Sequence, residues 1–139
     1  MKSLNLSLDF RSGIPSYIQI VEQVQVLLST GVLQQGDQLP TVRQLAAELR
    51  VNFNTIARAY RMLDDAGLIS TQQGRGTYIL ESLGENQKEY LKKNTLDPQI
   101  ERFLTLLKKQ GYQPEEIEKQ LKVSLKSMRD GTLHDTLET

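Results

Sequence analysis

The sequence predicts a mainly α fold with a small β wing, a winged helix-turn-helix followed by a helical dimerisation region. Two capped helical segments meet at a three-residue turn, a glycine-rich hairpin follows them, and apolar residues recur at helical spacing further on. We expect an N-terminal extension at 1–12, a winged helix-turn-helix at 13–81, the helical dimerisation region at 82–130 and a flexible tail at 131–139.

The N-terminal extension alternates apolar and polar residues. Leu4, Leu6, Leu8 and Phe10 fall on one side, which is the period of a half-buried strand. We expect this segment to pack against a first helix that begins near Pro15 and ends near Gly31. The apolar stripe predicted for that helix is Tyr17, Ile20, Val21, Val24, Leu27 and Leu28.

The next helix begins at a capping box. Thr41 can accept a hydrogen bond from the amide of Gln44, while the Gln44 side chain returns to Thr41. Its predicted apolar stripe is Val42, Leu45, Ala46 and Leu49. Arg43 must then face outward or toward a partner.

A turn at residues 50–52 leads to the second helix of the motif, with Asn52 as a suitable N-cap. On a helical wheel, Asn52, Ile56, Ala59, Tyr60 and Leu63 form a core stripe, whereas Asn54, Arg58 and Arg61 lie on the opposite face. Amide and guanidinium groups can pair with base edges and phosphates, and Phe53 and Ala57 flank them. The alternative is an ordinary solvated face, because any surface helix shows polar residues opposite its core stripe.

Two β-prone runs at 68–72 and 77–80 flank Gly74, Arg75 and Gly76. The glycines permit positive φ and a close approach of the backbone to another chain. Arg75 would project from the tip, where it could enter a minor groove of DNA. The alternative is a solvated turn arginine.

Residues 13 to 80 resemble the DNA-binding domain of the GntR family of bacterial transcription regulators. The segment 31–46 is similar to the family signature Gly-x-Leu-x-x-Gly-x-x-Leu-Pro-Ser-x-Arg-x-Leu-Ala. The segments 15–20, 63–69 and 74–79 resemble the opening of its first helix, its helix-to-wing connection and its wing.

The resemblance implies that Arg43, the helix start at 52–55 and the wing at 74–76 contact DNA. Many family members carry arginine at the position of Ala57; here the nearest arginine is Arg58, so its role as a phosphate or base contact stays a hypothesis. The run 54–60 instead resembles the YtrA-like subfamily. The candidate DNA-binding residues are Thr41, Arg43, Asn52, Phe53, Asn54, Thr55, Arg58, Arg61, Gln73, Gly74, Arg75 and Gly76.

Composition is compatible with a small cytoplasmic regulator. Lys and Arg number 17 and Asp and Glu number 17, so the net charge is zero. Five of the six arginines before residue 81 lie in the proposed DNA-reading elements, a placement that suits sequence-specific rather than bulk electrostatic binding. The chain has no cysteine and one histidine, His134, so we expect no enzyme activity, no metal site and no cofactor. No apolar run approaches membrane-spanning length.

The C-terminal region carries two predicted apolar stripes. After a polar segment at 82–94, Asp97 and Pro98 suit the start of a helix that ends near Gly111, and Pro114 begins another. The stripes are Ile100, Phe103, Leu104 and Leu107 on the first helix and Ile117, Leu121, Leu125 and Met128 on the second.

Two such helices cannot enclose a core, so their apolar faces need another surface. A second copy of the chain would supply one in a four-helix arrangement with two-fold symmetry, which the YtrA-like resemblance also implies. The alternative is packing against the chain's own DNA-binding domain. An effector, if the protein has one, would bind at the dimer interface or between domains. The sequence thus predicts a homodimeric repressor that binds double-stranded operator DNA, with a protein- or RNA-binding winged helix as the alternative.

Overall fold

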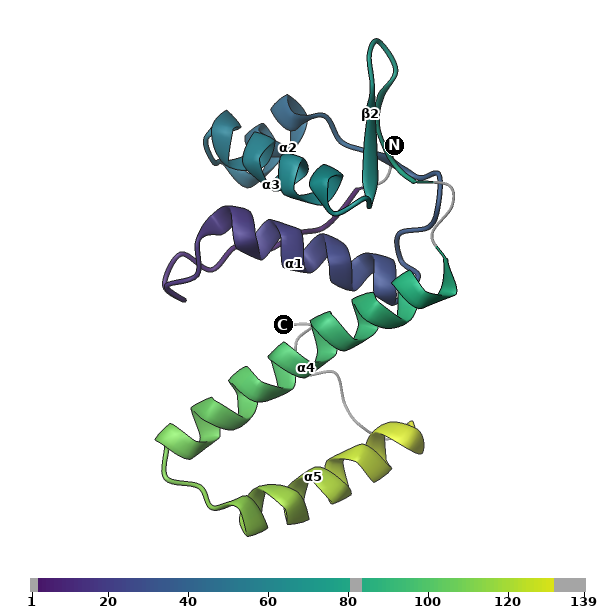
Figure 1. Ribbon diagram of the computed structural model, residues 1–139. Helices are drawn as coiled ribbons and strands as arrows, with labels where there is room; N and C mark the ends of the chain where they lie inside the picture. Colours follow the sequence, from purple (N-terminus) through teal and green to yellow (C-terminus); the bar gives the residue numbers. More distant parts are fainter. Residues whose placement is uncertain (1–2, 81–83, 132–139) are drawn as a thin grey trace. The chain divides into compact units, whose positions relative to one another are not determined.

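The computed structural model describes residues 3–80 and 84–131 and confirms the predicted fold class (Figure 1). It divides into two compact units, an N-terminal unit up to Leu96 and a C-terminal unit from Asp97 onward. The predicted tail lies almost entirely outside the described residues. The elements are α1 (Ser16–Ser29), β1 (Gln38–Leu39), α2 (Val42–Leu49), α3 (Phe53–Asp65), β2 (Ile69–Gln72), β3 (Gly76–Ile79), α4 (Glu85–Lys109) and α5 (Pro114–Arg129).

The core of the N-terminal unit lies among α1, α2, α3 and the sheet (Figure 1). The predicted stripe of α1 is confirmed, because its members are buried or packed against the core. The largest side chains that are completely buried are Ile20, Leu39, Leu45, Ile56, Leu63, Ile69, Ile79 and Val24. These residues come from every element between α1 and β3, so these elements share one hydrophobic core.

The N-terminal segment does not form the predicted strand. Leu4 is buried and Leu6 and Leu8 are half-buried, but Phe10 is 71% exposed, so that part of the prediction is wrong. The segment's backbone pairs with side chains of α1: Ser7 exchanges two hydrogen bonds with the amide of Gln23. Because a glutamine amide offers both a donor and an acceptor, it replaces the neighbouring strand that a ladder would need.

The wing is part of a three-stranded antiparallel sheet with the order β1-β3-β2. Ile69 lies opposite Ile79, and Gln72 lies opposite Gly76. The hairpin β2–β3 agrees with the predicted runs, but β1 was not predicted: Gln38 and Leu39 pair with Tyr78 and Thr77. A two-residue strand has too little alternation to be recognised in sequence. Its pairing fixes the base of the wing to the entry of α2.

Helix α4 is continuous from Glu85 to Lys109, with Pro98 inside it. The prediction that Asp97 and Pro98 begin a helix is therefore wrong. Proline removes a single backbone bond, and the turn before it adds others: the Asn94 and Thr95 side chains donate to the carbonyls of Tyr90 and Leu91, each at 2.7 Å. Leu91 and Thr95 are buried in the N-terminal unit, which anchors the first turns of α4 there.

The C-terminal unit has an exposed apolar surface. The last helix starts at Pro114 as predicted, with a capping box between Gln113 and Glu116 that the sequence reading missed. No residue of α5 is buried. Of the predicted stripes, Leu107, Ile117 and Leu121 are half-buried and the others are exposed. No helix among the described residues is long and apolar enough to cross a membrane.

Candidate nucleic-acid interface

The first helix of the motif starts at the predicted capping box. The Gln44 amide donates to Thr41 Oγ1 and the Thr41 amide donates to Gln44 Oε1, both at 3.0 Å. The hydroxyl of Thr41, a candidate DNA contact, is thus an acceptor within its own helix. This cap fixes the first turn of α2, and Arg43 lies on that turn with its side chain exposed.

The turn between α2 and α3 depends on an arginine in the left-handed conformation. Arg50 has φ 56° and ψ 46°, and the Val51 amide donates to the carbonyl of Ala46. Asn52 then caps α3 by accepting from the Asn54 amide at 2.8 Å. The wheel placed Asn52 on the core stripe, but its side chain is exposed because it caps the helix from outside. Its side-chain oxygen is engaged in this cap, and Asn52 stays a predicted DNA contact.

Tyr60 ties α3 to the start of α2. Its hydroxyl donates to the carbonyl of Pro40 at 2.6 Å, within the buried core. Burial, with a smaller contribution from the negative charge of Glu48, raises the pKa of the Tyr60 phenol above its ordinary value. The sequence predicted Tyr60 only as an apolar core residue, and no local signal points to the carbonyl of Pro40. The contact fixes the angle at which α3 is presented.

The outward face of α3 carries most of the predicted candidates. Phe53 is 52% exposed, and Asn54 and Arg61 are exposed, while Thr55 is half-buried. Arg58 is exposed as well, but its guanidinium carbon lies 3.9 Å from the centroid of the Tyr17 ring on α1. This cation–π contact was not predicted, because the wheel describes α3 without its neighbours. The first turn of α3 therefore presents an amide and an aromatic ring, and the following turns present guanidinium groups.

The tip of the wing has a fixed backbone and an exposed side chain. Gly74 and Gly76 have φ of 78° and 113°, values that L side chains rarely adopt. The carbonyl of Arg75 accepts from Gln38 Nε2 at 3.2 Å and from the Tyr78 hydroxyl at 2.9 Å. A Cβ at position 76 would lie 2.8 Å from that Gln38 nitrogen, a contact that the flexible glutamine side chain could relieve, so glycine is favoured there by its φ of 113°. Arg75 thus projects from a braced turn, beside the exposed Gln73.

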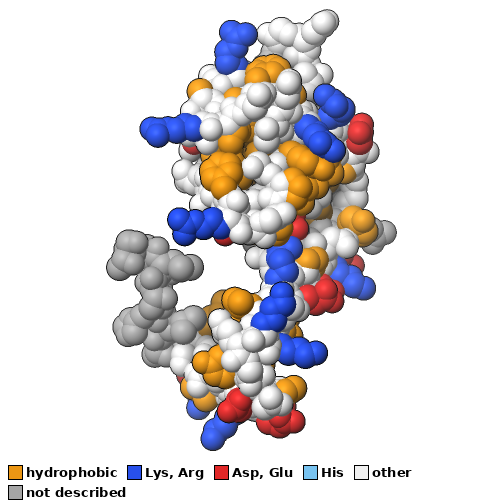
Figure 2. Space-filling model, turned by 90° about the vertical axis from the view of Figure 1, so that its left-hand side faces the viewer, with side chains coloured by type: hydrophobic (Ala, Val, Ile, Leu, Met, Phe, Trp, Pro, Cys, Tyr) orange, Lys and Arg blue, Asp and Glu red, His pale blue; other side chains and the backbone are white. Residues whose placement is uncertain are grey.

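Among the described residues, no acidic side chain neutralises the three guanidinium groups that this surface exposes most clearly. Among residues 3–80 and 84–131, no carboxylate forms an ion pair with Arg43, Arg61 or Arg75. In the space-filling view, Lys and Arg side chains project at several points from the N-terminal unit, and acidic side chains are few on that face (Figure 2). A surface with free guanidinium groups and little opposing charge suits a polyanion.

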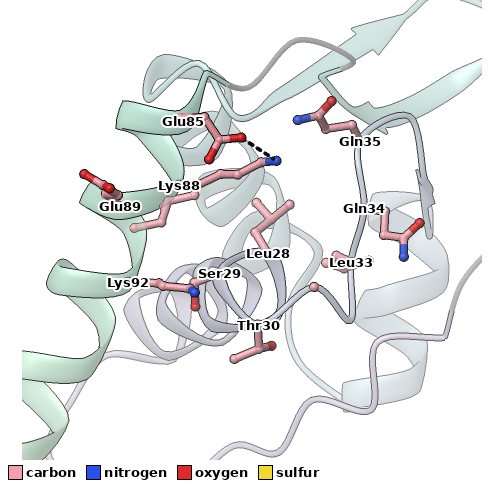
Figure 3. A pocket seen from close by; sticks show the side chains of 12 residues that line it. Leu28, Ser29, Thr30, Leu33, Gln34, Gln35, Glu85, Lys88, Glu89 and Lys92 are labelled. Carbon is pink, nitrogen blue, oxygen red and sulfur yellow. Dashed lines mark ion pairs between the residues drawn. The ribbon is translucent and has the colours of Figure 1, made fainter.

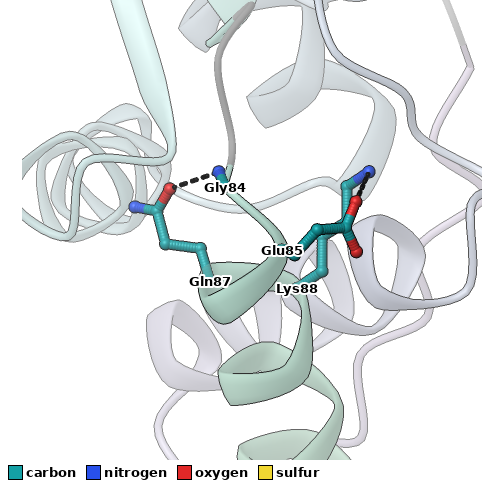
Figure 4. A network of polar contacts seen from close by, with 4 residues as sticks. All are labelled: Gly84, Glu85, Gln87 and Lys88. Carbon is teal, nitrogen blue, oxygen red and sulfur yellow. Dashed lines mark hydrogen bonds and ion pairs between the residues drawn. The ribbon is translucent and has the colours of Figure 1, made fainter.

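A polar pocket lies on another part of the N-terminal unit. It has a volume of about 630 Å³ and opens between the end of α1, the loop after it and the first turns of α4 (Figure 3). Glu85 and Lys88 form an ion pair of 3.6 Å at its edge, and Gln87 accepts from the Gly84 amide at the start of α4 (Figure 4). Its volume lies in the range of small-molecule sites.

The described residues hold no group of histidine, cysteine and acidic side chains that could bind a metal ion. The single histidine, His134, lies outside them. The candidate site consists of hydrogen-bonding groups and positive charge on α2, α3 and the hairpin.

Comparison with known proteins identifies the class. The family model of bacterial regulatory proteins, gntR family, matches residues 16–79, which span α1 to the end of β3. A GntR family transcriptional regulator from Listeria monocytogenes has a similar structure, with a TM-score of 0.64 and 34% identity over 81% of this chain and 97% of that one. The chain belongs to the GntR family of bacterial transcription regulators.

Within the family, the chain is YtrA-like. It is 44% identical over 77 residues to the HTH-type transcriptional repressor YtrA of Bacillus subtilis. That match covers 55% of this chain and 59% of the relative, so it spans little more than half of that protein. The structure of YtrA from Sulfolobus acidocaldarius, a GntR-family transcription factor, is also similar, with a TM-score of 0.53 and 35% identity over 72% of this chain and 97% of that one.

Proposed function

We propose that this protein is a sequence-specific repressor that binds an inverted-repeat operator as a homodimer. The observation that carries the proposal is the winged helix with free guanidinium groups on α2, α3 and the wing tip. Family membership and the names of the YtrA relatives support it.

Each element has a distinct part in the proposed complex. Helix α3 enters the major groove with its first turn, where the Asn54 amide can pair with adenine and Phe53 can contact a thymine methyl. Arg43 on α2 and Arg61 on α3 bind phosphates or guanine. Arg75 enters the adjacent minor groove, where the negative potential is concentrated. The backbone at Gly74 and Gly76 allows the wing to approach the duplex closely.

The C-terminal unit supplies dimerisation in this proposal. Its exposed apolar side chains include Phe103 at 47%, Leu125 at 48% and Met128 at 65%, which a monomer would leave in water. A two-fold dimer presents two copies of α3 to one face of the duplex, so we expect half-sites about 10 base pairs apart or a multiple of that. The groove that Leu104, Ile117 and Leu121 help to line has a volume of about 780 Å³ and would be filled by the partner.

The test is a comparison of duplexes at equal salt. Nuclease protection on the region upstream of the protein's own gene gives the operator, and fluorescence anisotropy then compares this duplex with a scrambled one of the same composition. We expect operator binding to be roughly a thousandfold tighter or more. Equal binding to both duplexes would contradict the proposal, and preferential binding to RNA or to a protein would replace it.

A further inference from the structure

Arg58 differs from the other arginines of the proposed interface, because its guanidinium group lies on a side chain of another helix. The stack on Tyr17, at 3.9 Å from carbon to ring centroid, holds it against the start of α1. A guanidinium that stacks on an aromatic ring keeps its planar N–H groups at the edge of the stack. The ring carries no charge, so the positive charge of Arg58 is held in place without being neutralised.

The Tyr17 hydroxyl, like the Arg58 guanidinium, is held in place without a polar partner among the described residues. Within the part of the chain that the structure describes, it makes no hydrogen bond and Arg58 makes no ion pair. Tyr17 is half-buried and packs against the core, so its ring is a fixed platform rather than a mobile surface group. The guanidinium fork of Arg58 thus lies over the ring that carries this hydroxyl, where α1 meets α3.

We propose that Arg58 and Tyr17 bind one backbone phosphate of the operator, and that Arg58 does not read a base. This inference rests on the proposed function. To reach a base edge, Arg58 would have to leave the ring and extend along the axis of the groove. Held on α1, it lies at the flank of α3, where the sugar-phosphate backbone passes a helix that is seated in the major groove. Base reading then falls to the other proposed contacts: the first turn of α3, the wing, Arg43 and Arg61.

The two classes of contact predict different behaviour in solution. A phosphate contact weakens binding to all sequences by the same factor and lowers the slope of log affinity against log salt by about one. A base contact instead reduces the ratio between operator and scrambled duplex. Tyr17 acts twice in this proposal: its ring positions Arg58, and its hydroxyl contacts the phosphate. Removing the whole side chain should therefore mimic much of the loss of Arg58.

The experiment measures affinity for operator and scrambled duplex across a salt series, with the full chain and its variants. For Arg58→Ala we expect roughly tenfold weaker binding to both duplexes, an unchanged ratio and a shallower salt slope. Tyr17→Phe keeps the stack and loses the hydroxyl, so its loss should be smaller. Tyr17→Ala should approach Arg58→Ala. The double variant Tyr17→Ala with Arg58→Ala should bind more weakly than Arg58→Ala only by about the small loss seen for Tyr17→Phe.

Lys119→Ala on α5 is the charge-matched control, because Lys119 is exposed and lies far along the chain from the interface. It should leave both affinities and the slope unchanged. Thermal melts check that each variant is folded; if Tyr17→Ala unfolds, Tyr17→Phe and Arg58→Lys carry the test, with Arg58→Lys losing affinity but keeping the slope.

A fall in the operator-to-scrambled ratio for Arg58→Ala would overturn the inference, as would additive losses in the double variant or an unchanged slope. A wild-type ratio of one would instead refute the proposed function. The two failures are therefore distinguishable in the same measurements.

Discussion

The N-terminal and C-terminal units use their apolar residues in opposite ways. The first unit completely buries large side chains from every element between α1 and β3, among them Ile20, Leu45, Ile56 and Ile79. In the second unit α5 buries none, and Phe103 and Met128 are among its exposed side chains. Burial of apolar surface is the main favourable term in folding. The first unit therefore contains the source of its stability, whereas the second leaves apolar side chains exposed, and the proposed dimer would cover them.

The difference follows from the number of layers that each unit provides. Around α3 stand α1, α2 and the sheet, so a residue such as Ile56 meets apolar neighbours from several directions. As far as residue 131, where the description ends, the second unit consists of the end of α4 and α5, and a pair of helices covers each apolar stripe on one side at most. This contrast predicts where single substitutions unfold the chain and where they only separate the subunits of the proposed dimer.

The largest effect is expected in the closed core. Leu45→Asp or Ile56→Asp would place an unpaired carboxylate at a completely buried position. The cost is several kcal/mol, against a total stability of about 5–15 kcal/mol for a domain. We expect both variants to lose the helical signal in circular dichroism and all DNA binding at 25 °C.

Ala47→Asp is the matched control, because Ala47 lies on the same helix as Leu45 but is exposed. It should melt within a few degrees of the wild type. Native melting of Leu45→Asp or Ile56→Asp would show that the core is less closed than the structure indicates.

The next effect is expected in the open unit. Phe103→Glu combined with Leu121→Glu charges both stripes, so we expect a folded monomer whose operator affinity falls roughly 100- to 10,000-fold, as the second half-site is lost. A shortened chain of residues 1–96 should behave in the same way. It keeps Leu91 in the core of the first unit, which a cut after Leu80 would remove.

Light scattering gives the mass, and Lys109→Glu, at an exposed position of α4, should leave it unchanged. If the wild type is a monomer, or the 1–96 chain a dimer, the interface lies elsewhere and the C-terminal stripes have another role.

A smaller effect is expected at the wing, whose tip is exposed although it belongs to the well-packed N-terminal unit. Arg75→Ala removes a side chain whose backbone is held by Gln38 and Tyr78, so the turn itself should persist. We expect operator affinity to fall by roughly 1–3 kcal/mol with an unchanged melting temperature. The operator affinity of Arg75→Lys should lie between those of the wild type and Arg75→Ala, because lysine keeps the charge but not the planar fork. Unchanged affinity in Arg75→Ala would remove the wing from the proposed interface.

The same contrast separates what sequence could predict from what it could not. Features set by neighbours in the chain were predictable: the Thr41 capping box, the Asn52 cap, the stripe of α1, the stripe of α3 apart from Asn52, and the glycines of the wing. Those set by distant residues were not, namely strand β1, the Tyr60 bond to Pro40 and the stack of Arg58 on Tyr17. A helical wheel or a short sequence window includes only residues that are close in the chain, so it cannot show contacts with another helix or strand.

Two errors have the same origin. The alternation at residues 4–10 predicts a strand, but a strand needs a partner, and α1 offers glutamine side chains instead: the Gln19 amide accepts from the Asp9 amide and donates back to the Asp9 carbonyl, each at 2.8 Å. Asp97 and Pro98 have the residue types of a helix start, yet the preceding turn is already helical and anchored through Leu91. The individual DNA contacts and the dimer contacts stay predictions, since they involve a second molecule.

The smallest effect is expected at the Tyr60 hydroxyl, and it sharpens the account of the closed core. Tyr60→Phe keeps the ring and removes one buried hydrogen bond to the Pro40 carbonyl, so it should cost about 0.5–1.5 kcal/mol of unfolding free energy at pH 7.

The pH dependence of stability distinguishes this hydrogen bond from simple packing. Because the folded state raises the pKa of the phenol, the unfolded chain releases this proton first, near its ordinary value of about 10, and stability falls as the pH rises above that value. Phenylalanine has no such proton, so the wild type should lose more stability than Tyr60→Phe between pH 9 and 11, and the gap measured by urea unfolding should narrow. A gap that stays constant over that range would mean that the Tyr60 hydroxyl reaches water and that the core is open at the junction of α2 and α3.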